Sequence, residues 1–580
     1  MSRSDAVFCG APPDGAPAKS AERSGSHARL GYVPCALFFE QNAVGMRNIQ
    51  RSLVTLLVFA ALSACGGGGS GSGSSNSPPP AATSQSAPPP GDGWVAGVYQ
   101  PSAHYAALCQ NPRSGVDPVS GKPYPDRQGS TLDENNFLRS WTNELYLWYS
   151  EVPDVDPGTY SSTPAYFDIL KSTATTSTGH PQDRFHFTYP TATWEQLSGA
   201  GVDIGYGVTW DIAVSTPPRQ VYAAYVWTGT SAAAAATAGV VRGWKIMSID
   251  GVDMINANDQ TSINTLNAGL TPASPGESHA FVFQDGNGVS YNVTLQAAAV
   301  TETPVPVVST FPTNTGTVGY ILFNDHIAPA EQGLVAAISQ LKSANVTDLV
   351  LDLRYNGGGL LDIASELAYM IAGPGPTAGE TFDLQAFNSK YPNTNPVTGA
   401  PITPTPFHTT AQGFSTAAGS ALPYLGLPRV FVLTGPNTCS ASEAIMNGLN
   451  GVNIQVIQIG STTCGKPYGF YPQDNCGTTY FSIEFQGDNA KAFGNYPDGF
   501  SPQNSSTLTS AVLPGCSVAD DFSHALGDPA EGRIAAALSY AAGQSCPTPP
   551  TGVSAPTAVT AANHPLVGLA PWRANRIMLR

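Results

Sequence analysis

Residues 430–451 read VFVLTGPNTCSASEAIMNGLNG, an apolar run typical of a buried strand followed by a segment with helical spacing. Ser440 and Glu443 stand three positions apart, as in a capping box, in which both side chains satisfy N–H groups of the first helical turn. A serine at a strand-to-helix junction can also be a nucleophile, because the N–H of Ala441 can stabilise an oxyanion. The stretch predicts an α/β fold and leaves both roles open for Ser440.

Other apolar runs extend this pattern into a sheet with helices between its strands. Strands are predicted at residues 318–323, 348–354, 429–435 and 453–460, and helices at 330–342 and 360–373. If the last two strands are parallel neighbours, the loops that follow them emerge at the same edge of the sheet. The loops carrying Ser440 and Lys466 would then meet.

Lys466 is a candidate base for that serine. It lies in GSTTCGKPYGF, residues 460–470, and the α/β region has only three other lysines, Lys342, Lys390 and Lys491. A lysine acts as a base only when neutral, which burial among apolar groups favours. The neighbouring Tyr468, Phe470 and Tyr471 fit that requirement. The alternative is an ordinary surface lysine.

A glycine-rich segment, Asn356-Gly357-Gly358-Gly359, connects a predicted strand to a predicted helix. Its backbone N–H groups could hold an anion or a carbonyl oxygen. No Gly-Lys-Ser/Thr follows, so it is not a nucleotide-binding P-loop. A tight turn with no binding role is the alternative.

Other nucleophile candidates are less well supported by the sequence. Ser339 and Lys342 form an S-x-x-K within a predicted helix, without the partner motifs of β-lactamases, and no G-x-S-x-G elbow appears in the right context. Cys439 is expected in a disulfide or buried, since it has no obvious histidine partner. His326, at a strand end, is expected to be a structural histidine.

Residues 196–300 have a different sequence pattern, with short runs of β-forming residues separated by turns. The segment SAAAAATAGVVRGWKIMSIDG, residues 231–251, resembles the pattern of PDZ modules. In such modules a glycine-rich loop presents N–H groups to a chain-terminal carboxylate. That loop would be Ile204-Gly205-Tyr206-Gly207, and a β-rich domain without a peptide site is the alternative.

The N-terminal part suggests export. From Met46, a short basic stretch, an apolar run over 53–62 and small residues before Cys65 predict a secretory signal peptide. Leu62-Ser63-Ala64-Cys65 resembles a lipoprotein box, which implies acylation of Cys65, although an ordinary signal peptide is possible. Gly66 after the cysteine favours the periplasmic side of the outer membrane. Residues 1–45 read as an upstream mis-start and 65–95 as a Gly/Ser/Pro-rich tether.

Composition excludes several classes of function. The chain has 580 residues and a net charge of −16, which argues against nucleic acid as a partner. Cysteines other than Cys9, Cys35 and Cys65 number six, which suggests disulfides in an oxidising compartment. No spacing indicates a metal site, and no cofactor is expected.

Residues 134–152 predict an amphipathic helix with a core-facing aromatic side.

Three motifs in order, LDLRYNGGGLL, LTGPNTCSASEA and GSTTCGKPYGF, are similar to those of the C-terminal-processing, or tail-specific, peptidases. That resemblance implies a crotonase-like α/β catalytic domain with a PDZ module. It also implies a Ser–Lys dyad, with Ser440 as nucleophile and Lys466, 26 residues later, as base. The oxyanion donors would be the N–H groups of Ala441 and of Gly357 or Gly358.

The chain departs from the family pattern after the lysine. Members typically continue Lys-Gly-x-x-Gln, and that Gln orients the lysine, but here Pro467 and Phe470 occupy those positions. Gln473 is a distant substitute. A family Asp eleven residues after the serine would fall on Gly451. Cys464 and Cys476 flank the loop, and we expect them to pair and pin Lys466.

The sequence thus predicts a helical N-terminal domain (96–195), a PDZ-like domain (196–300), a serine peptidase domain (301–546) and a Pro-rich, basic tail (547–580). The signal peptide spans 46–64. The predicted function is a lipid-anchored periplasmic endopeptidase that recognises the C-termini of protein or peptide substrates. The alternative is a non-catalytic peptide-binding lipoprotein with the same fold, and a serine hydrolase acting on a non-protein substrate is a third hypothesis.

Overall fold

A computed structural model describes residues 94–234, 239–550 and 576–577 of the chain. The expected mis-start, the signal peptide, Cys65, most of the tether and nearly all of the C-terminal tail lie outside these residues. Within the described ranges, no helix has both the length and the apolar character needed to cross a membrane.

The catalytic region is built on a six-stranded sheet with strand order β12-β13-β14-β18-β19-β26. All neighbours are parallel except β12 and β13. The four predicted strands are confirmed as β13, β14, β18 and β19, and the two predicted helices as α7 and α8. The elements of this sheet and its helices are β12 (Val307–Thr313), β13 (Gly316–Leu322), α7 (Ala330–Ser343), β14 (Asp348–Asp352), α8 (Leu361–Ala372), β18 (Arg429–Thr434), α10 (Ala441–Gly451), β19 (Gln455–Gly460), β26 (Gly515–Ser517) and α11 (Gly532–Ala541).

Both faces of this sheet are covered, because its strands are apolar on both sides. One face packs against α7, α8 and α10, with Leu351, Val432 and Ile445 in the shared core. The other face packs against α11, where Phe431 and Ile534 are buried together. The sheet is the middle layer of an α/β arrangement, and the loops after β18 and β19 leave it at one edge, as predicted.

Smaller helices and strands of the catalytic region lie outside the main sheet. They are β15 (Gly359–Leu360), α9 (Pro374–Thr377), β16 (Thr381–Phe387), β17 (Thr405–Pro406), β20 (Tyr468–Gly469), β21 (Gln473–Asn475), β22 (Thr478–Phe481), β23 (Phe485–Asp488), β24 (Phe500–Pro502), β25 (Ala511–Leu513) and β27 (Arg576–Ile577). Within the predicted tail, β27 pairs in parallel with β15.

A β-rich module with its own core precedes the catalytic region. Its main sheet runs β10-β9-β7-β6-β5, so β5 is an edge strand. Ile204 and Gly205, in the predicted carboxylate loop, belong to β4, which pairs with β11. The module consists of β4 (Val202–Gly205), β5 (Val208–Val214), β6 (Gln220–Val226), α5 (Ser231–Ala234), β7 (Lys245–Ile249), β8 (Val252–Asp253), α6 (Gln260–Leu270), β9 (Ser278–Gln284), β10 (Ser290–Gln296) and β11 (Ala298–Thr301).

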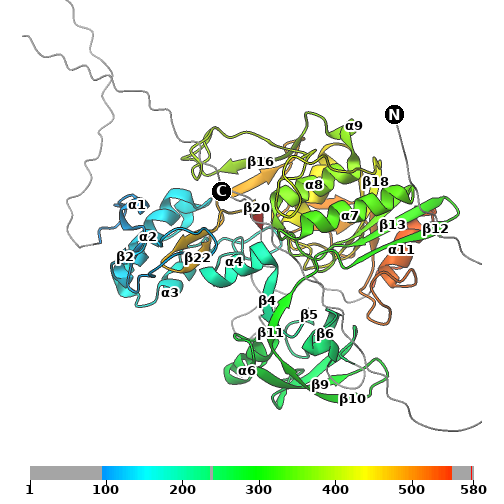
Figure 1. Cartoon of the computed structure of the whole chain (residues 1–580), viewed down its shortest axis with the longest axis horizontal. Coiled ribbons are helices and arrows are strands. Elements are labelled where there is room, and N and C mark those ends of the chain that lie inside the picture. The colour runs from blue at the N-terminus through cyan, green and yellow to red at the C-terminus, as the bar shows by residue number, and fades with distance from the viewer. Residues whose placement is uncertain (1–93, 235–238, 551–575, 578–580) are drawn as a thin grey trace, which may run out of the picture. The chain divides into compact units, whose positions relative to one another are not determined.

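The N-terminal segment contains the predicted amphipathic helix, α2, capped by Ser130. Phe137 and Trp141 are buried in a small core that also includes Tyr480 of β22. Figure 1 shows β22, drawn in orange, among the blue elements of this segment. The segment comprises α1 (Ser102–Tyr105), β1 (Leu108–Cys109), β2 (Arg127–Gln128), α2 (Thr131–Leu145), η1 (Tyr149–Glu151), η2 (Pro157–Thr159), α3 (Thr163–Asp168), β3 (Phe187–Pro190) and α4 (Thr191–Ala200).

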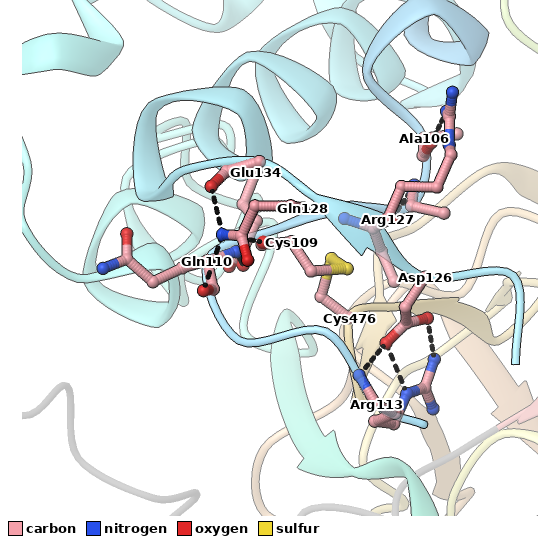
Figure 2. Close-up of a disulfide and its surroundings, with 12 residues drawn as sticks. Ala106, Cys109, Gln110, Arg113, Asp126, Arg127, Gln128, Glu134 and Cys476 are labelled. Atoms are coloured by element: carbon pink, nitrogen blue, oxygen red, sulfur yellow. Dashed lines mark hydrogen bonds and ion pairs between the residues drawn. A yellow bond between two sulfur atoms is a disulfide. The ribbon is translucent and has the colours of Figure 1, made fainter. Parts of the chain in front are cut away.

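This segment is joined to the catalytic region by a shared sheet and a disulfide. β3 pairs with β22 in the sheet β21-β22-β3. Cys109 of β1 is bonded to Cys476, in the turn between β21 and β22, beside the Arg113–Asp126 ion pair (Figure 2). The N-terminal segment therefore shares a sheet and a disulfide with residues of the catalytic region that are distant in sequence.

The predicted Cys464–Cys476 disulfide is wrong. The three disulfides among the described residues are Cys109–Cys476, Cys439–Cys464 and Cys516–Cys546. The hairpin β21–β22 carries Cys476 towards the N-terminal segment, whereas the common edge of β18 and β19 brings Cys464 beside Cys439. Sheet topology, which separates residues close in sequence, determines this pairing.

Candidate active site

Ser440 lies at the N-terminus of α10, directly after the loop that leaves β18. Its backbone has φ 59° and ψ −114°, a conformation that a residue with a side chain rarely adopts. The capping box is present, and the Ser440 N–H donates to Glu443 Oε2 at 3.0 Å. The Ser440 Oγ, however, is buried and makes no hydrogen bond of regular geometry. The hydroxyl is held in position by the backbone, and helix capping does not engage it in a regular hydrogen bond.

Lys466 lies in the loop between β19 and β20 and is fully buried. Its Nζ is 4.2 Å from the ring centre of Phe470 and 4.9 Å from that of Phe185. Burial disfavours the charged form of an amine, whereas the ring faces attract an ammonium group. The apolar surroundings that the sequence predicted around Lys466 are present, and the N-terminal segment supplies one of the rings.

Glu443 connects the serine loop to the lysine loop. Its carboxylate is fully buried and accepts hydrogen bonds from the N–H groups of Ser440 (3.0 Å), Gly465 (2.8 Å) and Lys466 (2.8 Å) and from Thr463 Oγ1 (2.5 Å). Burial raises the pKa of the Glu443 carboxyl, while these hydrogen bonds act to lower it. The Glu443 carboxylate accepts from four donors and donates in none of these hydrogen bonds. This pattern is typical of an ionised carboxylate.

Two further bonds join the same loops. The Cys439–Cys464 disulfide links the residue before Ser440 to the residue two before Lys466, with the Cα atoms 5.2 Å apart. The Cys464 N–H donates to the Thr438 carbonyl at 3.0 Å. From the N-terminal segment, Arg184 donates to the carbonyl groups of Cys464 and Gly465. The backbone on both sides of the dyad candidates is thus held from several directions.

The glycine-rich loop after β14 packs against the serine loop through Asn356. The Asn356 carbonyl accepts hydrogen bonds from Cys439 N–H (3.1 Å) and Ser442 Oγ (3.0 Å). The Gly358 N–H donates to Asn356 Oδ1 at 2.9 Å. In the described part of the chain, the N–H groups of Ala441 and Gly357 have no hydrogen-bond partner. Gly357 is thereby the better placed of the two glycine candidates for an oxyanion donor.

His326 supports this loop. It is fully buried, its Nδ1 is 3.0 Å from Asn356 Oδ1, and its N–H donates to the Gly358 carbonyl. Burial lowers the pKa of His326 to about 3, so the ring is neutral. These contacts fit the structural role that the sequence suggested.

The position where the family resemblance expects a lysine-orienting Gln is apolar. Phe470 is buried in the main core, with its ring 5.3 Å from that of Phe481. The amide of Gln473, the substitute considered from sequence, donates to the Asp474 carbonyl. The expectation that Cys439 is in a disulfide or buried is confirmed. Sequence reasoning missed the role of Glu443, although the capping box pointed to this residue, and the roles of Arg184 and Phe185, for which the sequence carried no local signal.

Comparison with known families identifies this arrangement. Residues 317–469, which include the glycine-rich loop, Ser440 and Lys466, match the profile of Peptidase family S41. Residues 133–189 match the profile of the Peptidase S41 N-terminal domain. The chain thus contains a peptidase domain of family S41. It is therefore a serine peptidase, related to the C-terminal processing proteases.

The chain is also similar to solved structures of proteases. A protein from Bacteroides fragilis assigned to the S41 proteases is 20% identical, with a TM-score of 0.50, over 72% of this chain and 98% of that chain. The photosystem II D1 C-terminal processing protease is 16% identical, with a TM-score of 0.38, over 67% of this chain and 94% of that chain. No curated protein matches the sequence.

Proposed function

We propose that this S41 peptidase is an endopeptidase with a Ser440–Lys466 dyad, which cleaves protein or peptide substrates recognised by their C-termini. The observation that carries this proposal is the pair of buried side chains on adjoining loops. Ser440 has a strained backbone and a hydroxyl without a hydrogen bond of regular geometry, and Lys466 is packed against aromatic rings. Strained backbone persists only where the surrounding structure enforces it, and it is concentrated at functional sites.

In the proposed reaction, Ser440 Oγ attacks the scissile carbonyl carbon while neutral Lys466 accepts the hydroxyl proton. The oxyanion that forms is held by the N–H groups of Ala441 and Gly357. Collapse of the tetrahedral intermediate breaks the C–N bond, and Lys466 returns the proton to the leaving amine. A water molecule, deprotonated by Lys466, then hydrolyses the acyl-enzyme and regenerates Ser440.

The β-rich module is proposed to bind the substrate's C-terminus in the manner of a PDZ domain. β5 is an edge strand, so its outer backbone groups can pair with an extended peptide. Tyr206, in the predicted carboxylate loop, is buried and donates from its hydroxyl to the Gly269 carbonyl at the end of α6. The N–H groups around Ile204–Gly207 would receive the carboxylate.

The location is likewise a proposal. The lipoprotein-box sequence ending at Cys65 supports a lipid anchor on the periplasmic side of the outer membrane. Three disulfides in the described residues support an oxidising compartment. Labelling with a radioactive fatty acid, compared between the wild type and Cys65→Ala, tests the anchor.

The dyad is tested with Ser440→Ala and Lys466→Ala in the full-length chain, on an unstructured protein with an apolar C-terminus. We expect each variant to lose at least about 1,000-fold in kcat, since the residues act as a unit. Cleavage that survives both changes would exclude the dyad. A folded wild type that binds the substrate without cleaving it would favour the peptide-binding alternative.

A further inference from the structure

The sequence position that the family resemblance assigns to a lysine-orienting Gln carries an apolar side chain. Phe470 fills that position, and Lys466 must be held by other groups. The described residues offer two such groups on the same pair of loops, the Glu443 carboxylate and the Cys439–Cys464 disulfide. Both are chemically distinct from the dyad and touch its backbone rather than its reacting atoms.

Glu443 holds the backbone of the serine loop and the backbone of the lysine loop through a single carboxylate. The same oxygen, Oε2, accepts from the N–H of Ser440 at 3.0 Å and from the N–H of Lys466 at 2.8 Å. Because Glu443 belongs to the first turn of α10, its own position is set by the helix that also carries Ala441. A movement of the lysine loop by even 1 Å would break these hydrogen bonds.

The disulfide restrains the same serine and lysine loops through a covalent bond. Cys439 precedes the strained Ser440, and Cys464 lies 3.6 Å from Glu443 Oε2 through its Sγ. A positive φ at a serine costs about 1–3 kcal/mol and relaxes unless neighbouring bonds prevent it. The S–S bond prevents this relaxation on the N-terminal side of Ser440, and the hydrogen bond to Glu443 prevents it on the C-terminal side.

We infer that Glu443 and the Cys439–Cys464 disulfide together are the positioning elements of the Ser440–Lys466 dyad, and that peptidase activity therefore depends on the oxidised state of this disulfide. The inference rests on the proposed dyad. It predicts an enzyme that is active when oxidised, and a reduced form that binds substrate but turns it over slowly.

The test uses the full-length oxidised chain and an unstructured protein substrate, before and after dithiothreitol. The reagent reduces the S–S bond to two thiols and is itself oxidised to a cyclic disulfide. We expect kcat to fall at least about tenfold, KM to change less than about threefold, and activity to return on reoxidation. The double variant C439S/C464S should have the low kcat and no response to dithiothreitol.

The matched control is C516S/C546S. Its disulfide closes a chain segment of similar length, with a sequence separation of 30 against 25, and lies outside the serine and lysine loops. This variant should keep the wild-type kcat and remain sensitive to dithiothreitol. If C439S/C464S does not fold, the variant C109S/C476S/C516S/C546S, which keeps only Cys439–Cys464 among the described disulfides, is compared before and after dithiothreitol, with circular dichroism to verify that the fold is kept.

Glu443→Gln tests the other positioning element. Glutamine has the same shape, but its NH₂ group would face N–H donors, so we expect kcat to fall about 100-fold with KM nearly unchanged. The inference is overturned if the wild type is active, Ser440→Ala is inactive, and C439S/C464S and Glu443→Gln both keep kcat within twofold. Equal activity of Ser440→Ala and the wild type would instead reject the dyad itself.

Discussion

Ser440 shows how one residue can combine two roles that the sequence presents as alternatives. It caps α10, and its N–H donates to Glu443, yet its hydroxyl makes no hydrogen bond of regular geometry and its φ is positive. A cap with a regular extended conformation would direct the hydroxyl to the helix N–H groups. The strained conformation instead leaves the oxygen available beside the N–H of Ala441.

Gly465 permits the approach of the lysine loop to a neighbouring segment. Its φ is +83°, and a Cβ at this position would lie 2.4 Å from the Pro497 carbonyl oxygen. We predict that Gly465→Ala displaces the adjacent Lys466, lowering kcat at least about tenfold and the melting temperature by several degrees. Steady-state kinetics and thermal unfolding measure both effects.

Gly399 is the matched control for that change. It has φ +69° but open space around its Cβ position. Gly399→Ala should cost only the backbone strain, about 1 kcal/mol, and leave kcat unchanged. Equal kinetic effects of the two substitutions would contradict the steric explanation.

The residues of the site differed in how well sequence could predict them. Ser440 and Lys466 stand in ordered motifs, and the parallel pairing of β18 and β19 brings their loops together as expected. The partner of Cys464 could not be predicted, because six cysteines allow many pairings and only the folded topology selects one. Phe185 reaches Lys466 through packing of a segment about 280 residues away in sequence.

At the scale of elements, buried charges join β14 to the segment before α11. Arg354 follows β14, is fully buried, and pairs with Asp352, Asp520 and Glu531. Arg354→Met would leave these carboxylates without their common partner. We predict a loss of about 3–5 kcal/mol in the free energy of unfolding, measured by guanidinium denaturation.

The exposed Lys171–Asp168 pair is the reference for that prediction. The Asp168 side chain is 70% exposed, so water already solvates the charge. Lys171→Met should change the free energy of unfolding by less than about 1 kcal/mol. Similar losses for both substitutions would show that burial does not determine the cost at Arg354.

Strand β5 of the β-rich module carries a carboxyl group with an unusual environment. Asp211 is buried, and burial together with the nearby Asp520 raises its pKa to about 6. An acid whose pKa is higher in the folded state favours folding while protonated, and this contribution is lost as the pH rises through about 6. The stability of the chain should therefore fall between pH 4 and pH 8 in part through Asp211.

Asp211→Asn removes this titration. A difference of about two pKa units corresponds to about 3 kcal/mol, so the variant should be more stable than the wild type at pH 8 by up to that amount. At pH 4 the two should be nearly equal, as thermal unfolding at both values will test. The exposed Asp168→Asn is the control, and an equal gain at both pH values would exclude the explanation.

The main sheet was predictable at this scale because its strands are continuous apolar runs between helical segments, as in β14 and β18. The association of β3 with β22 was not, since it joins strands separated by almost 300 residues. Local periodicity reports the existence of a strand but not its distant partner. The boundary expected near residue 195 therefore does not separate two independent units.

At the scale of the whole molecule, the Cys109–Cys476 disulfide spans 367 residues. In the chain-entropy description, closing a long segment restricts the unfolded state more than closing a short one. We predict that C109S/C476S lowers the free energy of unfolding by about 2–5 kcal/mol. The loss should exceed that of C516S/C546S, which spans 30 residues, by about 2 kcal/mol. Smaller losses for the long bridge in denaturant titrations would contradict this.

The same bond makes a covalent ring of residues 109 to 476, which contains the β-rich module, Ser440 and Lys466. A single backbone cut inside a ring opens it but releases no fragment. A peptidase that meets copies of itself, or other peptidases, is thereby protected against losing a whole module to one cleavage. Nicked molecules would keep their full mass on a non-reducing gel and separate into two pieces only after reduction.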